Sequence, residues 1–280
     1  MSAPRPCFCY ITDNHVRYVT YTRHAIASLR TFIPSDVPVF VLTDASDLAI
    51  PEADRTIPIS TVLRSFGLTD EHGQGRFPSL VWAKLLLPFV PELHAFSRSI
   101  CYDPDTRAVS AKVNDLLSVP FNGCEVLATA DDPPYRDLSV SRIQNTLHPS
   151  VLESPFAVPF RDVMLNRRPY ANAGLTVLDL DRLRATDDYA ARLRWMLDVQ
   201  ADYTLRYPEQ DWMNIGFSVR TIPSCYSHIY QFSFSKKDES HDAVWHYTNA
   251  AKKRLLDRLV EAWLKSMKRP SADETEYGEW

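Results

Sequence analysis

Short apolar runs alternate with longer segments in which apolar residues recur every three or four positions. Residues 7–12 and 37–42 form the first two apolar runs, and both have the length of buried strands. Between them, four apolar residues recur at helical spacing: Val19, Ile26, Leu29 and Ile33. A strand, a helix and a second strand predict a βαβ unit in a parallel sheet, with ligands beyond the carboxyl ends of the strands.

The same pattern predicts the later elements. Strands are expected at 55–59, 99–102, 124–130 and 169–180, and helices at 79–90, 181–203, 209–215 and 251–269. Residues 65–79 contain three of the seven glycines, which predicts a mobile loop that orders over a bound ligand. Residues 131–168 are polar and contain several prolines, so a long ligand-binding loop is expected there.

Composition indicates an ordinary globular protein. The 280 residues are 45% hydrophobic and 24% charged, enough for one large core. A net charge of −4 argues against nucleic acid as a partner. The five scattered cysteines predict reduced thiols, mostly in strands. Since no apolar run approaches the ~20 residues of a membrane span and no signal peptide is evident, we expect a cytoplasmic protein.

Two carboxylates one residue apart follow the strand at 99–102. In an extended chain, the side chains of Asp103 and Asp105 would point the same way, and Pro104 restricts the backbone between them. Carboxylates held this close repel each other unless a cation lies between them, so the pair predicts a divalent cation that bridges to phosphate oxygens. A polar turn is the alternative, because Asp-Pro-Asp-Thr is also good turn chemistry.

Other polar residues lie near the predicted ligand edge. Asp13 and Asn14 follow the first strand, where they would either bind a ligand or cap the next helix. Lys84 stands among apolar residues of a predicted helix, so its amine either reaches water or points into the site. Asn172 and Gly174 interrupt a strand, a place where glycine often marks the close approach of a ligand.

Taken in order, these residues resemble the family 8 glycosyltransferases, which transfer a sugar with retention of anomeric configuration. That family has a Thr/Asp-x-Asn element, a basic residue before an Asp-x-Asp strand, Asn-x-Gly, an acidic-Gln-x(3)-Asn helix and a late His-x(5)-Lys. The chain carries the set as Thr12 and Asn14, Lys84, Asp103 and Asp105, Asn172 and Gly174, Glu209, Gln210 and Asn214, and His246 and Lys252. It departs from the family in having His15 for tyrosine, Glu209 for aspartate and Asn249 for glycine.

The resemblance implies a GT-A type, Rossmann-like α/β fold, with a mixed central sheet flanked by helices. This domain would cover residues 1–250, and residues 251–280 would form a basic amphipathic helix and an acidic tail. The implied donor is a UDP-hexose carrying galactose or glucose, the cofactor is Mn²⁺ or Mg²⁺, and the acceptor is a glycan or a lipid-linked sugar bound by residues 133–168.

The resemblance also assigns roles to individual residues. The metal ligands would be Asp103, Asp105 and His246, a mixed carboxylate and imidazole set that suits Mn²⁺. The donor would be bound by Thr12, Asp13, Asn14, His15, Lys84, Tyr102 and Lys252. The reacting sugar would face Gln210, Glu209, Asn172 and Asp131, with either substitution on one face or a double displacement. Taken alone, His246 would be interpreted as a core histidine, and its spacing to Lys252 reverses that interpretation.

Alternatives remain for the function and for the C-terminal helix. Asp103 and Asp105 also fit the haloacid-dehalogenase phosphatases, although that motif normally ends a first strand. A catalytically inactive glycosyltransferase-like binding protein is a third possibility. Residues 251–269 carry a basic and an apolar face, so they would either pack on the domain or contact an anionic membrane at the cytoplasmic face.

Overall fold

A computed structural model describes residues 5–68, 79–131, 133–229, 242–247 and 250–267. The strands are β1 (Pro6–Ile11), β2 (Val39–Thr43), β3 (Arg55–Pro58), β4 (Arg98–Tyr102), β5 (Thr106–Ala108), β6 (Val126–Ala130), β7 (Ala171–Asp179), β8 (Val219–Ile222), β9 (His228–Ile229) and β10 (Val244–His246). The α-helices are α1 (Val16–Arg30), α2 (Ser60–Ser65), α3 (Ala83–Leu86), α4 (Pro133–Thr146), α5 (Pro149–Leu152), α6 (Val158–Met164), α7 (Leu180–Ala185), α8 (Tyr189–Asp202), α9 (Pro208–Gly216) and α10 (Ala250–Met267).

Seven strands form one mixed sheet in the order β3-β2-β1-β4-β7-β6-β8. β1 pairs parallel with β2 and β4, whereas β7 runs antiparallel to both β4 and β6. A second, three-stranded sheet has the order β5-β10-β9. The predicted mixed α/β sheet is therefore confirmed, and the carboxyl ends of β1 and β4 lie at the same edge.

Alternating side chains of the strands build a core on each face of the large sheet. On β1, Cys7 and Cys9 belong to one apolar cluster, while Phe8 and Tyr10 belong to the other. The first cluster packs under α3, α7, α8 and α9, and the second packs under α1. All the cysteines are free thiols, as predicted, and three of them are buried in β1 and β4.

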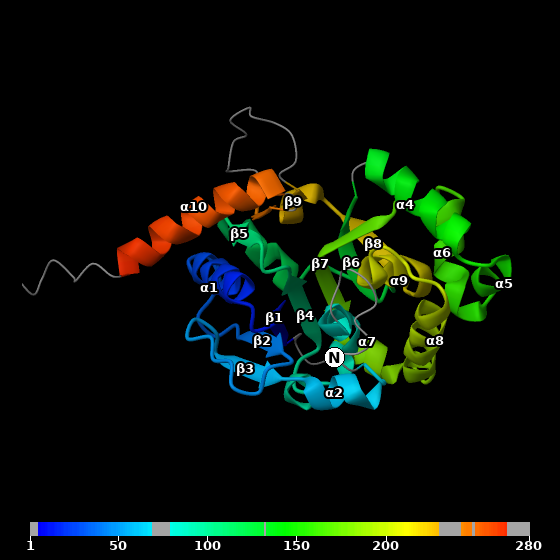
Figure 1. Cartoon of the computed structure of the whole chain (residues 1–280), viewed down its shortest axis with the longest axis horizontal. Helices are drawn as coiled ribbons and strands as arrows, with labels where there is room; N and C mark the ends of the chain where they lie inside the picture. Colours follow the sequence, from blue (N-terminus) through cyan, green and yellow to red (C-terminus); the bar gives the residue numbers. More distant parts are fainter. Residues whose placement is uncertain (1–4, 69–78, 132, 230–241, 248–249, 268–280) are drawn as a thin grey trace, which may run out of the picture.

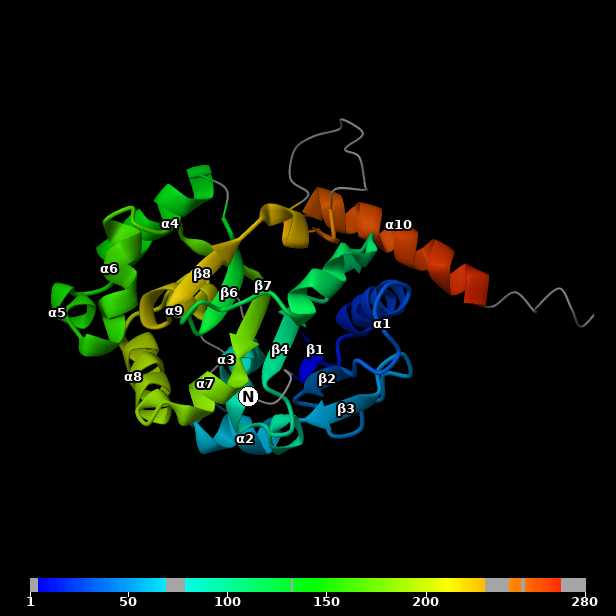
Figure 2. The same cartoon turned by 180° about the vertical axis from the view of Figure 1, so that it is seen from behind.

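Helix α10 packs against α1, and the two run side by side in both views (Figures 1 and 2). Leu256 and Val260 are buried with Tyr21 and Tyr247 in a small cluster of their own. Asp257 accepts hydrogen bonds from the Tyr21 hydroxyl group at 2.5 Å and from Arg17 at 2.9 Å. The sequence left packing on the domain as one alternative for this helix, and the structure shows that packing.

The segment predicted as a long loop is mostly helical, which corrects the sequence interpretation. α4, α5 and α6 occupy residues 133–164, and Figure 1 places them at the flank opposite α10. Proline lies in the first turn of α5 and of α6, where its missing amide and fixed φ favour a helix start. The prolines that suggested a loop therefore mark helix N-termini.

Two predicted helices are also divided. Residues 181–203 fall in α7 and α8, which residues 186–188 separate. Residues 79–90 form α3 between 3-10 turns, because Pro88 does not continue an α-helix. The predicted glycine-rich lid falls largely on residues 69–78, outside the described residues. Among the described helices, none is both long and apolar enough to cross a bilayer.

Candidate active site

The Asp-Pro-Asp stretch is a turn between β4 and β5, rather than the extended segment that the sequence suggested. The backbone amide of Asp103 donates to the carbonyl oxygen of Gly174 on β7 at 3.1 Å. The Thr106 hydroxyl group donates to the carbonyl oxygen of Asp103 at 2.7 Å, which closes the turn. The turn brings the carboxylates of Asp103 and Asp105 to one side, so the predicted convergence holds although the backbone differs.

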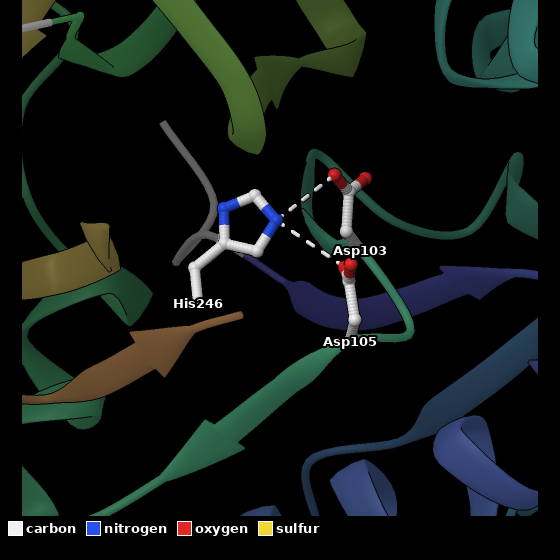
Figure 3. A group of neighbouring side chains, drawn as sticks. All are labelled: Asp103, Asp105 and His246. Atoms are coloured by element: carbon white, nitrogen blue, oxygen red, sulfur yellow. Dashed lines mark ion pairs between the residues drawn. The ribbon is translucent and has the colours of Figure 1, made fainter. Parts of the chain in front are cut away.

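His246 reaches this turn because β10 pairs antiparallel with β5, which places His246 opposite Thr106. Its Nε2 atom lies 3.4 Å from Oδ2 of Asp103 and 3.2 Å from Oδ1 of Asp105 (Figure 3). Gly174 leaves room for the imidazole, since a Cβ atom there would lie 2.3 Å from the ring. The three predicted metal ligands, separated by more than a hundred residues, therefore meet at one point.

The chemistry and spacing of these three side chains fit a divalent cation. One ligand atom from each lies within 4.8 Å of the others. Mg²⁺ binds its oxygen ligands at about 2.0–2.1 Å, so side chains this close together can reach one ion. A set of two carboxylates and one imidazole suits Mn²⁺ better than an all-oxygen set does.

Lys84 points into the site. Its Nζ atom lies 2.5 Å from Oδ1 of Asp103 and 2.5 Å from Oε1 of Glu209, and it donates to the Ala173 carbonyl oxygen at 2.7 Å. Only 5% of the side chain is exposed, so the alternative in which its amine reaches water is wrong. Burial alone would lower the pKa of Lys84, but the two carboxylates raise it, so the lysine remains a fixed positive charge.

The buried charges shift one another's pKa values. Burial opposes ionisation of Asp103, but Lys84 and His246 hold its pKa well below the usual range. Burial likewise disfavours a charged imidazole, but Asp105 and Asp103 raise the pKa of His246 to about 9. Burial raises the pKa of Glu209 to about 7, with Lys84 opposing the shift. Glu209 can therefore hold or release a proton near neutral pH.

Helix α9 and strand β7 bring together the residues expected to face the reacting sugar. The Gln210 side-chain oxygen accepts a hydrogen bond from the Ala173 amide at 3.0 Å, and its Nε2 atom lies 3.4 Å from Oδ2 of Asp131. The Asn172 side-chain oxygen accepts from the Gly174 amide at 2.8 Å. The polar groups of Gln210, Asn172 and Asp131 thus line one short stretch of β7.

Behind Gln210 lies a buried group that the sequence analysis missed. Asp211 is fully buried and accepts hydrogen bonds from the Tyr170 hydroxyl group at 2.5 Å and from Arg142 at 2.6 Å. The same Tyr170 oxygen lies 3.4 Å from Nε2 of Gln210. Asp211 stands within the acidic-Gln-x(3)-Asn helix that the sequence singled out, so its place in that helix was the available signal.

The residues after β1 cap α1. Oδ1 of Asp13 accepts from the His15 amide at 3.0 Å, and Nδ1 of His15 accepts from the Arg17 amide at 3.3 Å. Thr12 is buried, whereas Asn14 and His15 are exposed. The N-cap of α1 is therefore His15, rather than Asp13 or Asn14 as the capping alternative had it, and the exposed His15 ring lies at the edge of the sheet.

Tyr102 and Lys252 do not join the cluster through any contact that the structure describes. Tyr102 is buried in the core, and its hydroxyl group donates to the Tyr226 carbonyl oxygen at 2.8 Å. Lys252 lies in α10, but its side chain is outside the described part of the chain. The donor-binding roles given to these two residues remain predictions.

Lys253, which follows Lys252 in the sequence, does reach the site. The Nζ atom of Lys253 lies 2.9 Å from Oδ2 of Asp105 and 5.5 Å from the centre of the Tyr18 ring. The sequence analysis missed it because the His-x(5)-Lys spacing directs attention to the preceding lysine. No sequence signal identified Lys253, because the anchoring of Asp257 on α1, one turn later, is visible only in the structure.

No family model matches the chain, and no curated protein sequence matches it. Several solved structures, however, have a fold similar to that of this chain. The galactosyltransferase LgtC, in complex with donor and acceptor sugar analogues, has a TM-score of 0.60 and 13% identity, covering 95% of this chain and 98% of that one. Mouse xyloside xylosyltransferase 1 has a TM-score of 0.60 and 12% identity, covering 89% of this chain and 99% of that one.

The bifunctional glycosyltransferase WbbM is similar with a TM-score of 0.58 and 13% identity. The match covers 89% of this chain but only 46% of WbbM, so this chain spans about half the length of that protein. At such identities the likeness concerns the fold. The resemblance to family 8-like glycosyltransferases is thereby confirmed in the architecture: the chain has a GT-A glycosyltransferase fold.

Proposed function

We propose that the protein is a metal-dependent glycosyltransferase that moves a hexose, galactose or glucose, from a UDP-sugar to a glycan or lipid-linked acceptor, with retention of configuration. The observation that carries this proposal is the meeting of Asp103, Asp105 and His246 at the ligand-binding edge of a GT-A sheet. A similar fold in a galactosyltransferase bound to donor and acceptor sugar analogues supports it.

Asp103, Asp105 and His246 would hold Mn²⁺ or Mg²⁺. When bound, the ion would neutralise the charge that develops on the departing nucleoside diphosphate. Lys84 supports this arrangement because it fixes one oxygen of Asp103 while leaving the other directed toward His246. The exposed His15 would lie beside the base of the nucleotide, with Thr12, Asp13 and Asn14 in the same loop, and Tyr102 and Lys252 complete the proposed donor set.

The reacting sugar would lie against Gln210, Glu209, Asn172 and Asp131. The Glu209 carboxyl group is anchored by Lys84 at the side of this face. The Gln210 side chain is oriented by the Ala173 amide, so its amide nitrogen is directed at Asp131. Both substitution on one face and a double displacement are compatible with this arrangement.

The phosphatase alternative receives less support. Its nucleophile would be Asp103, which follows β4 rather than a first strand and whose oxygens are already engaged by Lys84 and His246. An inactive binding protein would bind UDP with metal but would not release the sugar. Turnover therefore separates the three functions.

The decisive experiment is a panel of UDP-, GDP- and ADP-sugars assayed for hydrolysis without acceptor, with Mn²⁺ or with EDTA. We expect metal-dependent release of hexose from UDP-galactose or UDP-glucose. Asp105→Asn should lower that rate roughly a thousandfold, because a charge-stabilising ligand is lost. Failure to hydrolyse any sugar nucleotide, or release of phosphate from unrelated monoesters, would contradict the proposal.

We place the protein in the cytoplasm, with α10 able to touch an anionic membrane surface. Besides the side that packs on α1, α10 exposes Arg254 and Arg258 beside Leu255, and Met267 is exposed near its end. Binding to anionic liposomes at low salt should fall when Arg254 and Arg258 are both changed to Glu. Equal retention of wild type and variant by neutral and anionic liposomes would remove the membrane contact.

A further inference from the structure

A lysine from the C-terminal helix sits on a carboxylate of the predicted metal site. Lys253 contacts Oδ2 of Asp105, while Oδ1 of the same carboxylate faces Nε2 of His246. Both oxygens of Asp105 therefore have positively charged or polar partners that come from the chain itself. A cation approaching this carboxylate from solution has to compete with the ammonium group.

The two lysines of the site differ in how firmly they are held. Lys84 is 5% exposed and has three partners: Asp103, Glu209 and the Ala173 carbonyl oxygen. The Lys253 side chain is 23% exposed, and besides Asp105 its described partner is the face of Tyr18. Its flexible stem can therefore move from the carboxylate while remaining near the aromatic ring. Lys84 is a fixed charge, whereas Lys253 is free to exchange partners.

The helix backbone at Lys253 is nevertheless held in place. One turn later, Asp257 is bound to Tyr21 and Arg17 of α1, and Leu256 and Val260 are buried beside it. The helix backbone thus stays next to the site while the ammonium group changes its contact. Such an arrangement suits a side chain that alternates between two nearby anions.

We propose that Lys253 is an exchangeable counter-ion of the metal site. In the free protein it neutralises Asp105 and competes with a divalent cation; when cation and nucleoside diphosphate bind together, it moves to the diphosphate. This second contact rests on the proposed function, whereas the competition with the cation does not. The diphosphate brings negative charge for both the divalent cation and the Lys253 ammonium group. Binding of the metal therefore raises the affinity for the nucleotide, and binding of the nucleotide raises the affinity for the metal.

Lys253→Met tests the exchange because its two effects have opposite signs. Mn²⁺ binding without nucleotide should tighten roughly three- to tenfold, since the competing charge is gone. The loss of the paramagnetic resonance signal of free Mn²⁺ measures this binding. UDP binding at saturating Mn²⁺, measured by calorimetry, should weaken roughly tenfold, since a charged contact to phosphate is lost. Lys265→Met removes the same charge from an exposed position later in α10 and should change neither constant.

Lys253→Arg keeps the charge and should behave like the wild type toward Mn²⁺ alone. Lys253→Gln serves as a second neutral variant if the methionine variant does not fold. Equal Mn²⁺ affinity in wild type and neutral variants, weaker Mn²⁺ binding by the variants, or no Mn²⁺ binding by any of them would overturn the exchange. If Mn²⁺ binding tightens but UDP binds to none of the proteins, the counter-ion role stands and the proposed donor is wrong.

Discussion

At the scale of single residues, the candidate site depends on a position that has no side chain. Gly174 lies on β7 beside the Asp-Pro-Asp turn, and a Cβ atom there would be 2.3 Å from the His246 ring. Close approach of this kind excludes even alanine unless the ring moves. The sequence marked Gly174 as a place of close approach by a ligand, and in the structure the neighbour is the imidazole.

Gly174→Ala should displace the imidazole and weaken Mn²⁺ binding about as much as His246→Ala does. Combining the two substitutions should weaken binding little beyond His246→Ala alone, because both act through the same ring. Calorimetric titration of the three variants with Mn²⁺ checks this. Additive losses in the double variant would show that Gly174 acts through something other than His246.

Tyr170→Phe tests whether the buried pair of Tyr170 and Asp211 orients Gln210. The lost hydroxyl group contacts both Asp211 and Gln210, so the Gln210 amide should lose part of its orientation. We expect kcat to fall roughly tenfold with little change in KM. Tyr226→Phe removes a hydroxyl group that contacts Asp115 and serves as the control. A rise in KM at constant kcat would indicate that Tyr170 acts on binding instead.

The meeting of Asp103, Asp105 and His246 could be predicted from the sequence because their spacing and order resemble a known family. The contacts of Lys253, Tyr170 and Asp211 could not, since each joins segments that are distant in sequence. For Asp211, the sequence pointed to its helix but not to its partners. The charge of Lys253 looks like any surface lysine until α10 is seen against the Asp-Pro-Asp turn. Sequence spacing identifies ligand types, whereas tertiary packing decides which of two adjacent lysines reaches the site.

At the scale of elements, the buried strands of the large sheet were the easiest to predict, whereas the short strands β5, β8, β9 and β10 were not predicted. The apolar runs that became β1, β2, β4, β6 and β7 are almost entirely buried, so their composition is strongly marked. The helices within 133–164 were missed because α4 lacks a clear apolar stripe and prolines open α5 and α6. A proline favours a loop in one context and begins a helix in another.

A buried ion pair joins the helical flank to the sheet. Arg192 of α8 binds both carboxylate oxygens of Glu125, just before β6, at 2.7 and 3.1 Å, and both side chains are 9% exposed. Glu125→Gln would leave the Arg192 charge buried without its counter-charge, so unfolding free energy should fall by about 3–5 kcal/mol. Replacing Glu125 by Leu and Arg192 by Met together should lower the free energy of unfolding much less.

The same pair predicts a pH dependence. Burial would raise the pKa of Glu125, but Arg192 and Ser218 hold it below its usual value. A depressed carboxyl pKa contributes stability that is present above the pKa of the unfolded chain and is lost as pH falls through the folded value. Urea titrations between about pH 6 and pH 3 should show a smaller acid loss in Glu125→Gln than in the wild type.

At the scale of the whole molecule, the fold class was predictable but the arrangement of its flanks was not. The βαβ start indicated a parallel sheet, and the resemblance to the family 8 glycosyltransferases implied the mixed α/β sheet. Which helices cover which face depends on contacts such as those of α10 with α1 and of α6 with α9, and no local pattern encodes these. The placement of α10 on one flank and of α4, α5 and α6 on the other, seen in Figure 1, could therefore not be predicted from the sequence.

The pairing of β10 with β5 has a consequence for the order in which the protein is made. Asp103 and Asp105 leave the ribosome long before His246, and the strand that carries His246 follows every strand of the large sheet. Since chains emerge from the N-terminus and distant pairings form slowly, the cluster of Asp103, Asp105 and His246 is among the last features to be assembled. Uptake of Mn²⁺ by refolding protein would then report the final step of maturation, later than the gain of helical circular dichroism.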